Sequence, residues 1–267
     1  MGVKHFRLDD PDSFKLEEID PDDTSGGPSS KNEARAADEA LHERLAELQE
    51  LLFAEHEHKL LIVLQGMDTS GKDGTVRHVM MGISPASVRA VSFKKPTATE
   101  LDHDYLWRVH PHVPGKGEIV IFNRSHYEDV LVIRVHDFVP KQVWKKRYAQ
   151  INDFERMLSE NDVTILKLFL HISREEQRER LQARLDDPTK RWKFQHGDLD
   201  ERKLWDEYQQ AYEEALRKTS TEWAPWYVIP ANRKWFRDHV VASIIVKTLE
   251  KFDMKYPQPE LASERVE

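Results

Sequence analysis

The sequence contains no cysteine, which excludes disulfide bonds and catalysis by a thiolate. No stretch approaches the roughly 20 apolar residues that a membrane-spanning helix needs, and the first residues, MGVKHFRLDD, lack the apolar segment of a secretion signal. The 13 histidines show no spacing typical of metal ligands. From these absences we expect a cytoplasmic protein without a membrane partner.

Excess positive charge is also absent. The formal net charge is −8, and positions 1–58 account for it with 16 acidic and 6 basic residues, because the rest of the chain holds 32 acidic and 34 basic residues. Nucleic-acid-binding domains usually carry a basic excess, so we expect no nucleic acid partner. A nearly neutral body can still present local basic patches to a smaller anionic ligand.

The length of 267 residues suits one large α/β domain. Residues 1–32 are rich in Asp, Ser, Pro and Gly and predict an acidic, mostly irregular arm. Disorder is the simplest expectation for this arm, and packing against a neighbouring subunit is the alternative. Residues 33–267 are expected to form a single domain, with Asn32 as a candidate N-cap of its first helix.

Short, continuous apolar runs alternate with segments of helical periodicity. Such runs are typical of strands buried on both faces of a parallel sheet, so the alternation predicts an α/β fold with an open, doubly wound sheet of about five strands. Residues 186–198 interrupt it with a polar, basic and aromatic segment, which predicts a lid within about residues 180–200. The expected strands are 59–65, 88–93, 118–122, 165–172 and 226–230, and the expected helices are 33–56, 72–83, 98–109, 140–161, 174–185, 199–218 and 234–252.

The segment GMDTSGKDGT, residues 66–75, follows the first expected strand and opens a helix, as a phosphate-binding P-loop does. Its glycines allow the backbone to wrap inward, so that N–H groups and the positive end of the helix bind phosphate oxygens, while the lysine adds a charge. The alternative is a glycine-containing turn without a ligand. The predicted phosphate-binding residues are Gly66, Met67, Thr69, Ser70, Gly71, Lys72 and Asp73.

This P-loop carries carboxylates in unusual positions. Asp73 replaces the Ser or Thr whose hydroxyl normally binds Mg²⁺, but the helix dipole favours a carboxylate at this position in any protein, so both a metal role and a purely structural one stay open. Asp68 lies in the middle of the loop, where it would repel phosphate. A Mg²⁺ ion between the two would remove this repulsion, with Mn²⁺ as an alternative.

A second candidate segment, IVIFNRSHYED at residues 119–129, ends another buried strand, and ligands of open α/β sheets bind at such strand ends. Arg124 is placed to neutralise a transferring phosphoryl group. Glu128 and Asp129 are candidate metal ligands, although an acid often stands at the position of Asn123. The alternative is a solvated helix start with Arg124 in a structural ion pair, and it stays open above all for Asp129.

Basic residues form a third signal. We expect four of them to contact phosphate, Lys94 outside the lid and Arg184, Lys190 and Lys193 within it. Arg180 shares a helix face with Arg184. The run Lys145–Arg147 is interpreted as a solvated helix face, as charge runs usually are.

Five segments, in one order along the chain, resemble the second family of polyphosphate kinases. They are the P-loop GMDTSGKDGT, SFKKPTATELDHDYLWRVH, FNRSHYEDVLVIRV, RLDDPTKRWKFQHGDL and APWYVIPANRKWFRD. The resemblance covers most of the chain from about residue 33. The form NRSHYEDVL is most similar to the group of the family that accepts both AMP and ADP.

The resemblance implies a thymidylate-kinase-like P-loop fold with a helical lid. It implies reversible, Mg²⁺-dependent phosphoryl transfer between inorganic polyphosphate and adenine nucleotides, with guanine nucleotides as a second class, by a dimer or tetramer. Asp68, Lys72 and Arg124 would be catalytic, and Arg124 and Glu128 would contact the acceptor nucleotide. Two other hypotheses stay open, an ATP-dependent nucleoside monophosphate kinase and a non-catalytic polyphosphate-binding module.

Overall fold

The computed structural model describes residues 2–195 and 197–258. Its centre is a five-stranded sheet in the order β2-β3-β1-β4-β5, in which every neighbouring pair is parallel. The predicted fold class is therefore confirmed, and a strand overlaps each of the five predicted apolar runs. The strands are β1 (Lys59–Gln65), β2 (Val88–Ser92), β3 (Ile119–Asn123), β4 (Val163–His171) and β5 (Trp226–Pro230).

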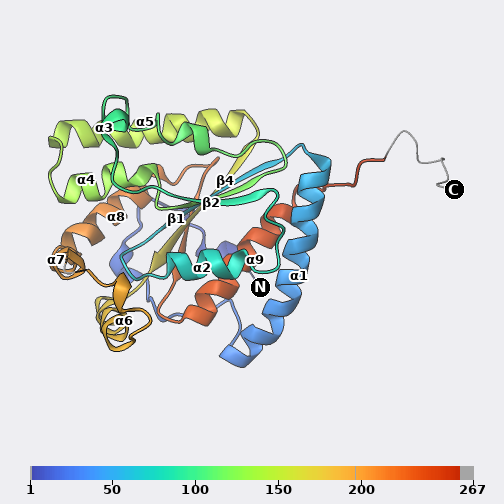
Figure 1. Cartoon of the computed structure of the whole chain (residues 1–267), viewed down its shortest axis with the longest axis horizontal. Coiled ribbons are helices and arrows are strands. Elements are labelled where there is room, and N and C mark those ends of the chain that lie inside the picture. The colour runs from blue at the N-terminus through green and yellow to red at the C-terminus, as the bar shows by residue number, and fades with distance from the viewer. Residues whose placement is uncertain (1, 196, 259–267) are drawn as a thin grey trace.

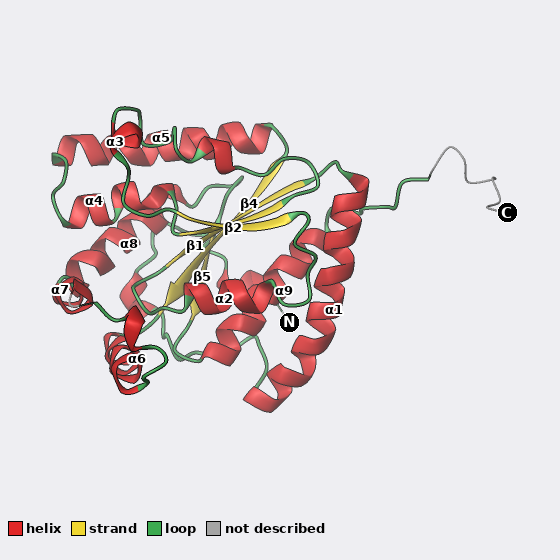
Figure 2. Ribbon diagram, viewed as in Figure 1, coloured by secondary structure: helices red, strands yellow, loops and turns green. Residues whose placement is uncertain are grey.

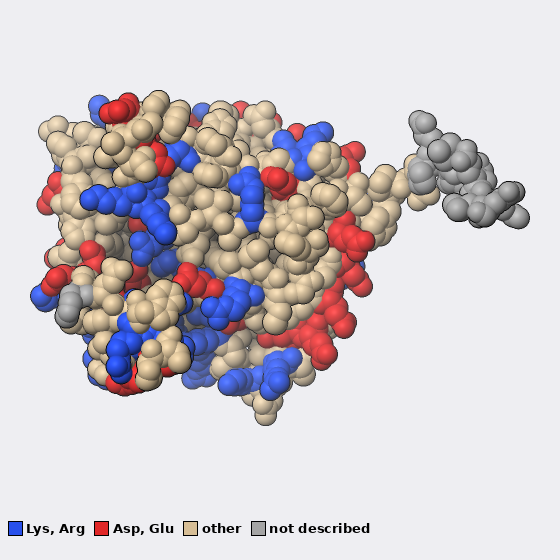
Figure 3. All heavy atoms as spheres, in the orientation of Figure 1, with Lys and Arg blue, Asp and Glu red and all other residues tan. Residues whose placement is uncertain are grey.

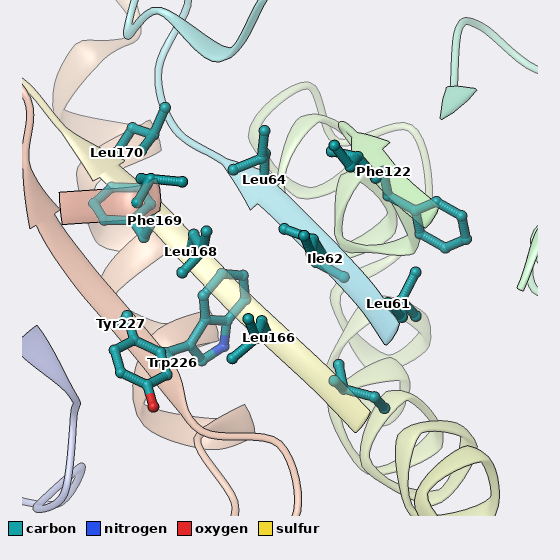
Figure 4. Close-up of a cluster of buried hydrophobic side chains, with 14 of the residues drawn as sticks. Leu61, Ile62, Leu64, Phe122, Leu166, Leu168, Phe169, Leu170, Trp226 and Tyr227 are labelled. Atoms are coloured by element: carbon teal, nitrogen blue, oxygen red, sulfur yellow. The ribbon is translucent and has the colours of Figure 1, made fainter. Parts of the chain in front are cut away.

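The sheet forms the core because its central strands bear apolar side chains on both faces. Ile62 of β1 pairs in register with Leu166 of β4, and both are almost fully buried, as Figure 4 shows. On the other side of β1, Leu64 lies beside Asn123 of β3. The P-loop that follows β1 and the polar segment that follows β3 therefore begin at adjacent strand ends.

Helices cover both sides of the sheet (Figures 1 and 2). α1, α2 and α9 lie on one side and α4, α5 and α8 on the other, while α6 and α7 lie at the lower left of the view. Within the described ranges, no helix has both the length and the apolar character required to cross a bilayer. The helices are α1 (Lys31–Glu55), α2 (Lys72–Val79), α3 (Ala98–Leu101), α4 (Val132–Val135), α5 (Lys141–Glu160), α6 (Arg174–Asp186), α7 (Gly197–Lys203), α8 (Trp205–Thr219) and α9 (Lys234–Glu250).

Several helix predictions were wrong in detail. The helix expected over 98–109 is only α3, because the carboxylate of Asp104 accepts the N–H of Leu106 and so replaces a helical hydrogen bond. The helix expected over 199–218 is divided at Leu204, which is the N-cap of α8. The first helix is capped by Ser30 rather than Asn32, since the Ser30 hydroxyl accepts the N–H of Glu33.

The N-terminal arm is packed against the body, so the expectation of disorder was wrong for its described residues. It is irregular apart from two short 3-10 helices, Val3–Phe6 and Leu16–Glu18. Phe6 and Leu16 are at most 4% exposed, and the N–H of Leu8 donates to the carbonyl of Trp226 in β5. A few apolar residues in an acidic segment are therefore enough to attach it to the free edge of the sheet.

Charge is distributed unevenly over the surface. In Figure 3, acidic side chains gather along the edge formed by α1, at the right, whereas Lys and Arg are more frequent over the left and lower parts. The helix α1 carries exposed acidic side chains such as Glu43, Glu47 and Glu50. The negative net charge therefore does not prevent the opposite part of the molecule from attracting anions.

Candidate active site

The P-loop spans the six residues between β1 and α2. Gly66 and Gly71 have φ angles of 149° and 104°, which are conformations that L side chains rarely adopt. A Cβ atom on Gly71 would lie only 1.7 Å from a guanidinium nitrogen of Arg237. Glycine is therefore required at Gly71 both for backbone conformation and for space.

Two buried arginines stabilise the loop by hydrogen bonds to its backbone carbonyls. Arg180 of α6 donates to the carbonyls of Thr69 and Ser70, both at 2.9 Å, and Arg237 of α9 donates to the carbonyl of Ser70 at 3.0 Å. Because the two ends of a trans peptide point in opposite directions, the N–H of Gly71 then faces away from Arg237. This role of Arg180 and the part played by Arg237 were not predicted from the sequence.

Lys72, Thr69 and Ser70 place polar groups inside the loop. The ammonium of Lys72 donates to the carbonyls of Gly66 and Met67, and burial lowers the pKa of Lys72, an effect that Asp68 opposes. The hydroxyls of Thr69 and Ser70 are buried and have no hydrogen-bond partner among the described residues. Such buried hydroxyls fit a loop that binds phosphate oxygens or the hydration shell of a metal ion.

Asp68 faces the segment that follows β3. Its carboxylate accepts a hydrogen bond of 2.8 Å from the guanidinium of Arg124, and the two side chains are 36% and 46% exposed. Thr69 and Arg124 both have positive φ angles, 68° and 64°, which cost energy for non-glycine residues and occur often at functional sites. The pair is thus accessible to a ligand, and strained backbone lies at Arg124 and directly after Asp68.

Asp73 and Asn123 contact each other across the two strand ends. The side-chain amide of Asn123 donates to the carboxylate of Asp73 at 2.7 Å. This contact gives Asp73 a structural partner in addition to the start of α2. The structure therefore supports the structural interpretation of Asp73 and provides no second acid at the end of β3.

Glu128 and Asp129 are adjacent but lie in different surroundings. Glu128 accepts a hydrogen bond of 3.2 Å from Gln65, and burial raises the pKa of Glu128 although Arg124 and Lys72 oppose the shift. Asp129 instead forms a 2.8 Å ion pair with Arg147, and burial raises the pKa of Asp129 to about 6. Of these two acids, only Glu128 is placed beside the P-loop residues.

The environment of Arg147 corrects one interpretation. The run Lys145–Arg147 was expected to be solvated, but the side chain of Arg147 is only 14% exposed and lies over the ring of Tyr105. Asp129 therefore forms its ion pair with a residue of α5, Arg147. The alternative kept open for Asp129, a structural ion pair, agrees with this geometry.

The basic residues predicted to contact phosphate make their contacts elsewhere in this structure. Lys190 pairs with Asp187 at 2.6 Å, Arg184 lies 4.0 Å from Asp198, and Lys193 lies over the ring of Trp192, so these contacts are within the lid. Lys94 is exposed, and its carbonyl accepts a hydrogen bond from Arg108. The structure brings together Asp68, Lys72, Arg124 and Glu128 but not these four.

A metal ion at this site would have few protein ligands. Among residues 2–195 and 197–258, no group of three or more His, Cys, Asp or Glu side chains could hold one. Mg²⁺ is commonly bound by one or two carboxylates together with water and substrate phosphates, and Asp68 with Glu128 fits this pattern. The partnerless hydroxyls of Thr69 and Ser70 are suitable for its hydration shell.

Comparisons with known proteins agree on one family. The family model described as polyphosphate kinase 2 matches residues 28–257. The chain is 60% identical to an AMP/ADP-polyphosphate phosphotransferase of Meiothermus ruber over 99% of both chains. It is 46% identical to an ADP-polyphosphate phosphotransferase of Rhodopseudomonas palustris over 81% of this chain and 79% of the relative. The crystal structure of polyphosphate kinase 2 from Arthrobacter aurescens matches with a TM-score of 0.93 and 45% identity, over 97% of this chain and 92% of the other.

Proposed function

The chain belongs to the polyphosphate kinase 2 family, and on that premise we propose that it transfers a phosphoryl group reversibly between inorganic polyphosphate and both AMP and ADP. The family membership predicted from the five segments is confirmed, and the protein is a polyphosphate kinase. The observation that best supports the proposal is the group Asp68, Lys72, Arg124 and Glu128 at the mouth of a P-loop.

The reaction is an in-line displacement at the terminal phosphorus of the polyphosphate chain. A phosphate oxygen of AMP or ADP forms a bond to this phosphorus, and the bond to the next bridging oxygen breaks, which leaves a shorter chain. The attacking oxygen is already ionised near pH 7, so no side-chain base is needed. Catalysis then consists of positioning the reactants and neutralising charge.

Each residue of the site has a role in this scheme. The backbone of the P-loop and Lys72 bind the transferring phosphoryl group, and Arg124 neutralises charge on it in the transition state. Asp68 and Glu128 would hold Mg²⁺, which supplies further charge neutralisation when bound. The charges of Arg124 and Lys72 act on the carboxylate of Glu128, and this position beside the phosphate-binding residues supports a contact between Glu128 and the nucleotide.

The test is to mix the purified protein with Mg²⁺ and polyphosphate, add AMP or ADP separately, and resolve the nucleotides over time by chromatography. ADP and then ATP formed from AMP, only in the presence of polyphosphate, is the expected result. ATP from ADP alone would restrict the acceptor range. Phosphorylation of AMP only when ATP is supplied would identify a nucleoside monophosphate kinase, and a thermal shift with polyphosphate but no product would identify a binding module.

The resemblance of the sequence also supports a homo-oligomer, either a dimer or a tetramer. Light scattering coupled to size-exclusion chromatography distinguishes these two states from a monomer.

A further inference from the structure

Helix α7 is connected to the P-loop through a single buried side chain. Gln177 of α6 is 2% exposed, and its amide nitrogen donates to the carbonyl of Asp68 at 3.3 Å. Its amide oxygen accepts a hydrogen bond of 2.9 Å from the guanidinium of Arg202, which belongs to α7. α7 begins inside the segment that the sequence predicts to be a lid, so Gln177 joins this segment to the loop.

The two partners fix the orientation of the amide. A guanidinium has only donors, and a backbone carbonyl has only lone pairs, so Arg202 must face the oxygen of Gln177 and Asp68 must face its nitrogen. A residue of this length with one donor and one acceptor is required. Glutamate could still accept from Arg202 but could not donate to Asp68, and methionine could do neither.

Gln177 differs from the other supports of the loop. The carbonyls of Asp68, Thr69 and Ser70 are all held by side chains of α6 or α9. Arg180 also donates to the carbonyls of Ala231 and Asn232, which follow β5 in the body of the protein. Gln177 alone among these supports is held by α7, so the position of α7 bears on Asp68 rather than on the rest of the loop.

The neighbouring residue of α7 contacts a second element. Glu201 lies within 2.9 Å of the ring nitrogen of His136, directly after α4, and accepts a 2.7 Å hydrogen bond from the hydroxyl of Tyr208. α4 follows in sequence the segment that carries Glu128. Two consecutive residues of α7, Glu201 and Arg202, therefore join it to His136 and to Gln177.

We propose that Gln177 is a positioning residue that fixes the peptide group of Asp68, and with it the carboxylate opposite Arg124, when α7 is docked. The proposal rests on the proposed function and deepens it, because it makes the placement of an acid in the P-loop depend on the helix that begins in the lid. Arg202 acts through Gln177, and Gln177 acts through Asp68.

The experiment compares Gln177→Met and Arg202→Met with the wild type. Gln182→Met is the matched control, because Gln182 is an exposed residue of the same helix whose amide donates a hydrogen bond to Asp186, away from the P-loop. In the metal-free proteins, backbone amides of residues 66–75 should exchange hydrogen faster in both variants than in the wild type or the control. In the assay, kcat should fall by about tenfold or more, since misplacing a catalytic group by 1 Å can cost on the order of 10²-fold.

Two further measurements distinguish a positioning role of Gln177 from a purely structural role. The Mg²⁺ concentration for half-maximal activity should rise in Gln177→Met while the KM for the nucleotide changes little. In an Asp68→Asn background, Gln177→Met should cost much less than it costs in the wild type, because residues that act through one another are not additive. An undiminished cost in that background, or exchange and kcat equal to those of the wild type, would overturn the proposal.

The outcomes also separate this inference from the proposed function. If the wild type forms no polyphosphate-dependent product, the proposed function fails, and the hydrogen exchange of residues 66–75 decides the inference by itself. If Gln177→Met does not fold, Arg202→Met removes the same link from its half-buried end, and unchanged exchange in that variant would contradict the proposal.

Discussion

Two ion pairs flank the segment that follows β3, and they differ in almost every respect. The first pair is Arg124 with Asp68, whose side chains are 46% and 36% exposed, and the backbone of Arg124 has a positive φ angle. The second pair is Lys167 of β4 with Glu155 of α5, which are fully buried at a distance of 2.6 Å. The first pair can exchange its partners for a ligand, whereas the second is enclosed by protein.

The buried pair is hydrogen-bonded on all sides. Lys167 donates to Glu155, to the hydroxyl of Tyr127 and to the carbonyl of Thr219, which uses all three of its N–H groups. Glu155 also accepts from the hydroxyl of Tyr127 and lies 3.2 Å from His126. Burial alone would raise the pKa of Glu155, but Lys167 and His126 outweigh it and keep this pKa below its ordinary value.

The difference between the pairs shows how charge placement separates stability from chemistry. Tyr127 and His126 directly precede Glu128, so the buried pair anchors the chain from which Glu128 and Arg124 extend. The exposed pair leaves its charges available to phosphate. Removing a charge from the buried pair should therefore reduce stability, and removing one from the exposed pair should reduce activity.

The largest expected effect is on the buried pair. Lys167→Met leaves the carboxylate of Glu155 buried and unpaired, which should lower the free energy of unfolding by about 3–5 kcal/mol. Chemical denaturation followed by fluorescence measures this change. The double variant Lys167→Met/Glu155→Gln is the control and should lose less than the single variant, because no unpaired charge remains. An equal or larger loss in the double variant would contradict this explanation.

The second effect is on the exposed pair, where we expect a loss of activity with little loss of stability. Arg124→Ala should reduce kcat by on the order of 10²–10³-fold, as removal of a group that stabilises transition-state charge does. The free energy of unfolding should change by less than about 1 kcal/mol, since solvent-exposed ion pairs contribute little. Turnover close to that of the wild type, in a folded variant, would show that Arg124 is not catalytic.

A third, smaller effect concerns a buried histidine that contacts the N-terminal arm. His171 of β4 donates from Nε2 to the carbonyl of Ile19 in the arm, and burial lowers the pKa of His171 to about 4. The unfolded chain then binds more protons than the folded protein between about pH 4 and pH 6.5, so stability should fall as the pH is lowered through this range. At about 1.36 kcal/mol per pH unit, the loss is on the order of 3 kcal/mol at most.

The measurement compares unfolding at pH 7 and pH 4.5. His171→Gln keeps a donor for Ile19 but cannot be protonated in this range, so it should lose less stability than the wild type between the two conditions. His103→Gln, at an exposed histidine, is the control and should behave like the wild type. Equal acid sensitivity of all three proteins would exclude His171 as a source of it.

Much of the fold could be predicted because its signals are local. Each strand is a short apolar run, and the P-loop is a pattern of glycine and lysine at fixed spacing directly after the first of them. The short helices at 98–101 and 132–135 could not be predicted in the same way. Their bounds depend on single side-chain hydrogen bonds and on packing, such as the contact of Asp104 with Leu106.

The parallel α/β class, the position of the P-loop and the family could be predicted from the residues alone, because apolar runs and motif spacing encode them. The role of each charged residue depends instead on the partners that folding brings to it. Asp129 is neutralised by Arg147, 18 positions away, and the carbonyl of Ser70 is held by Arg180, 110 positions away. Adjacent residues such as Glu128 and Asp129 look alike in the sequence, but burial and partners brought together by folding give them different surroundings.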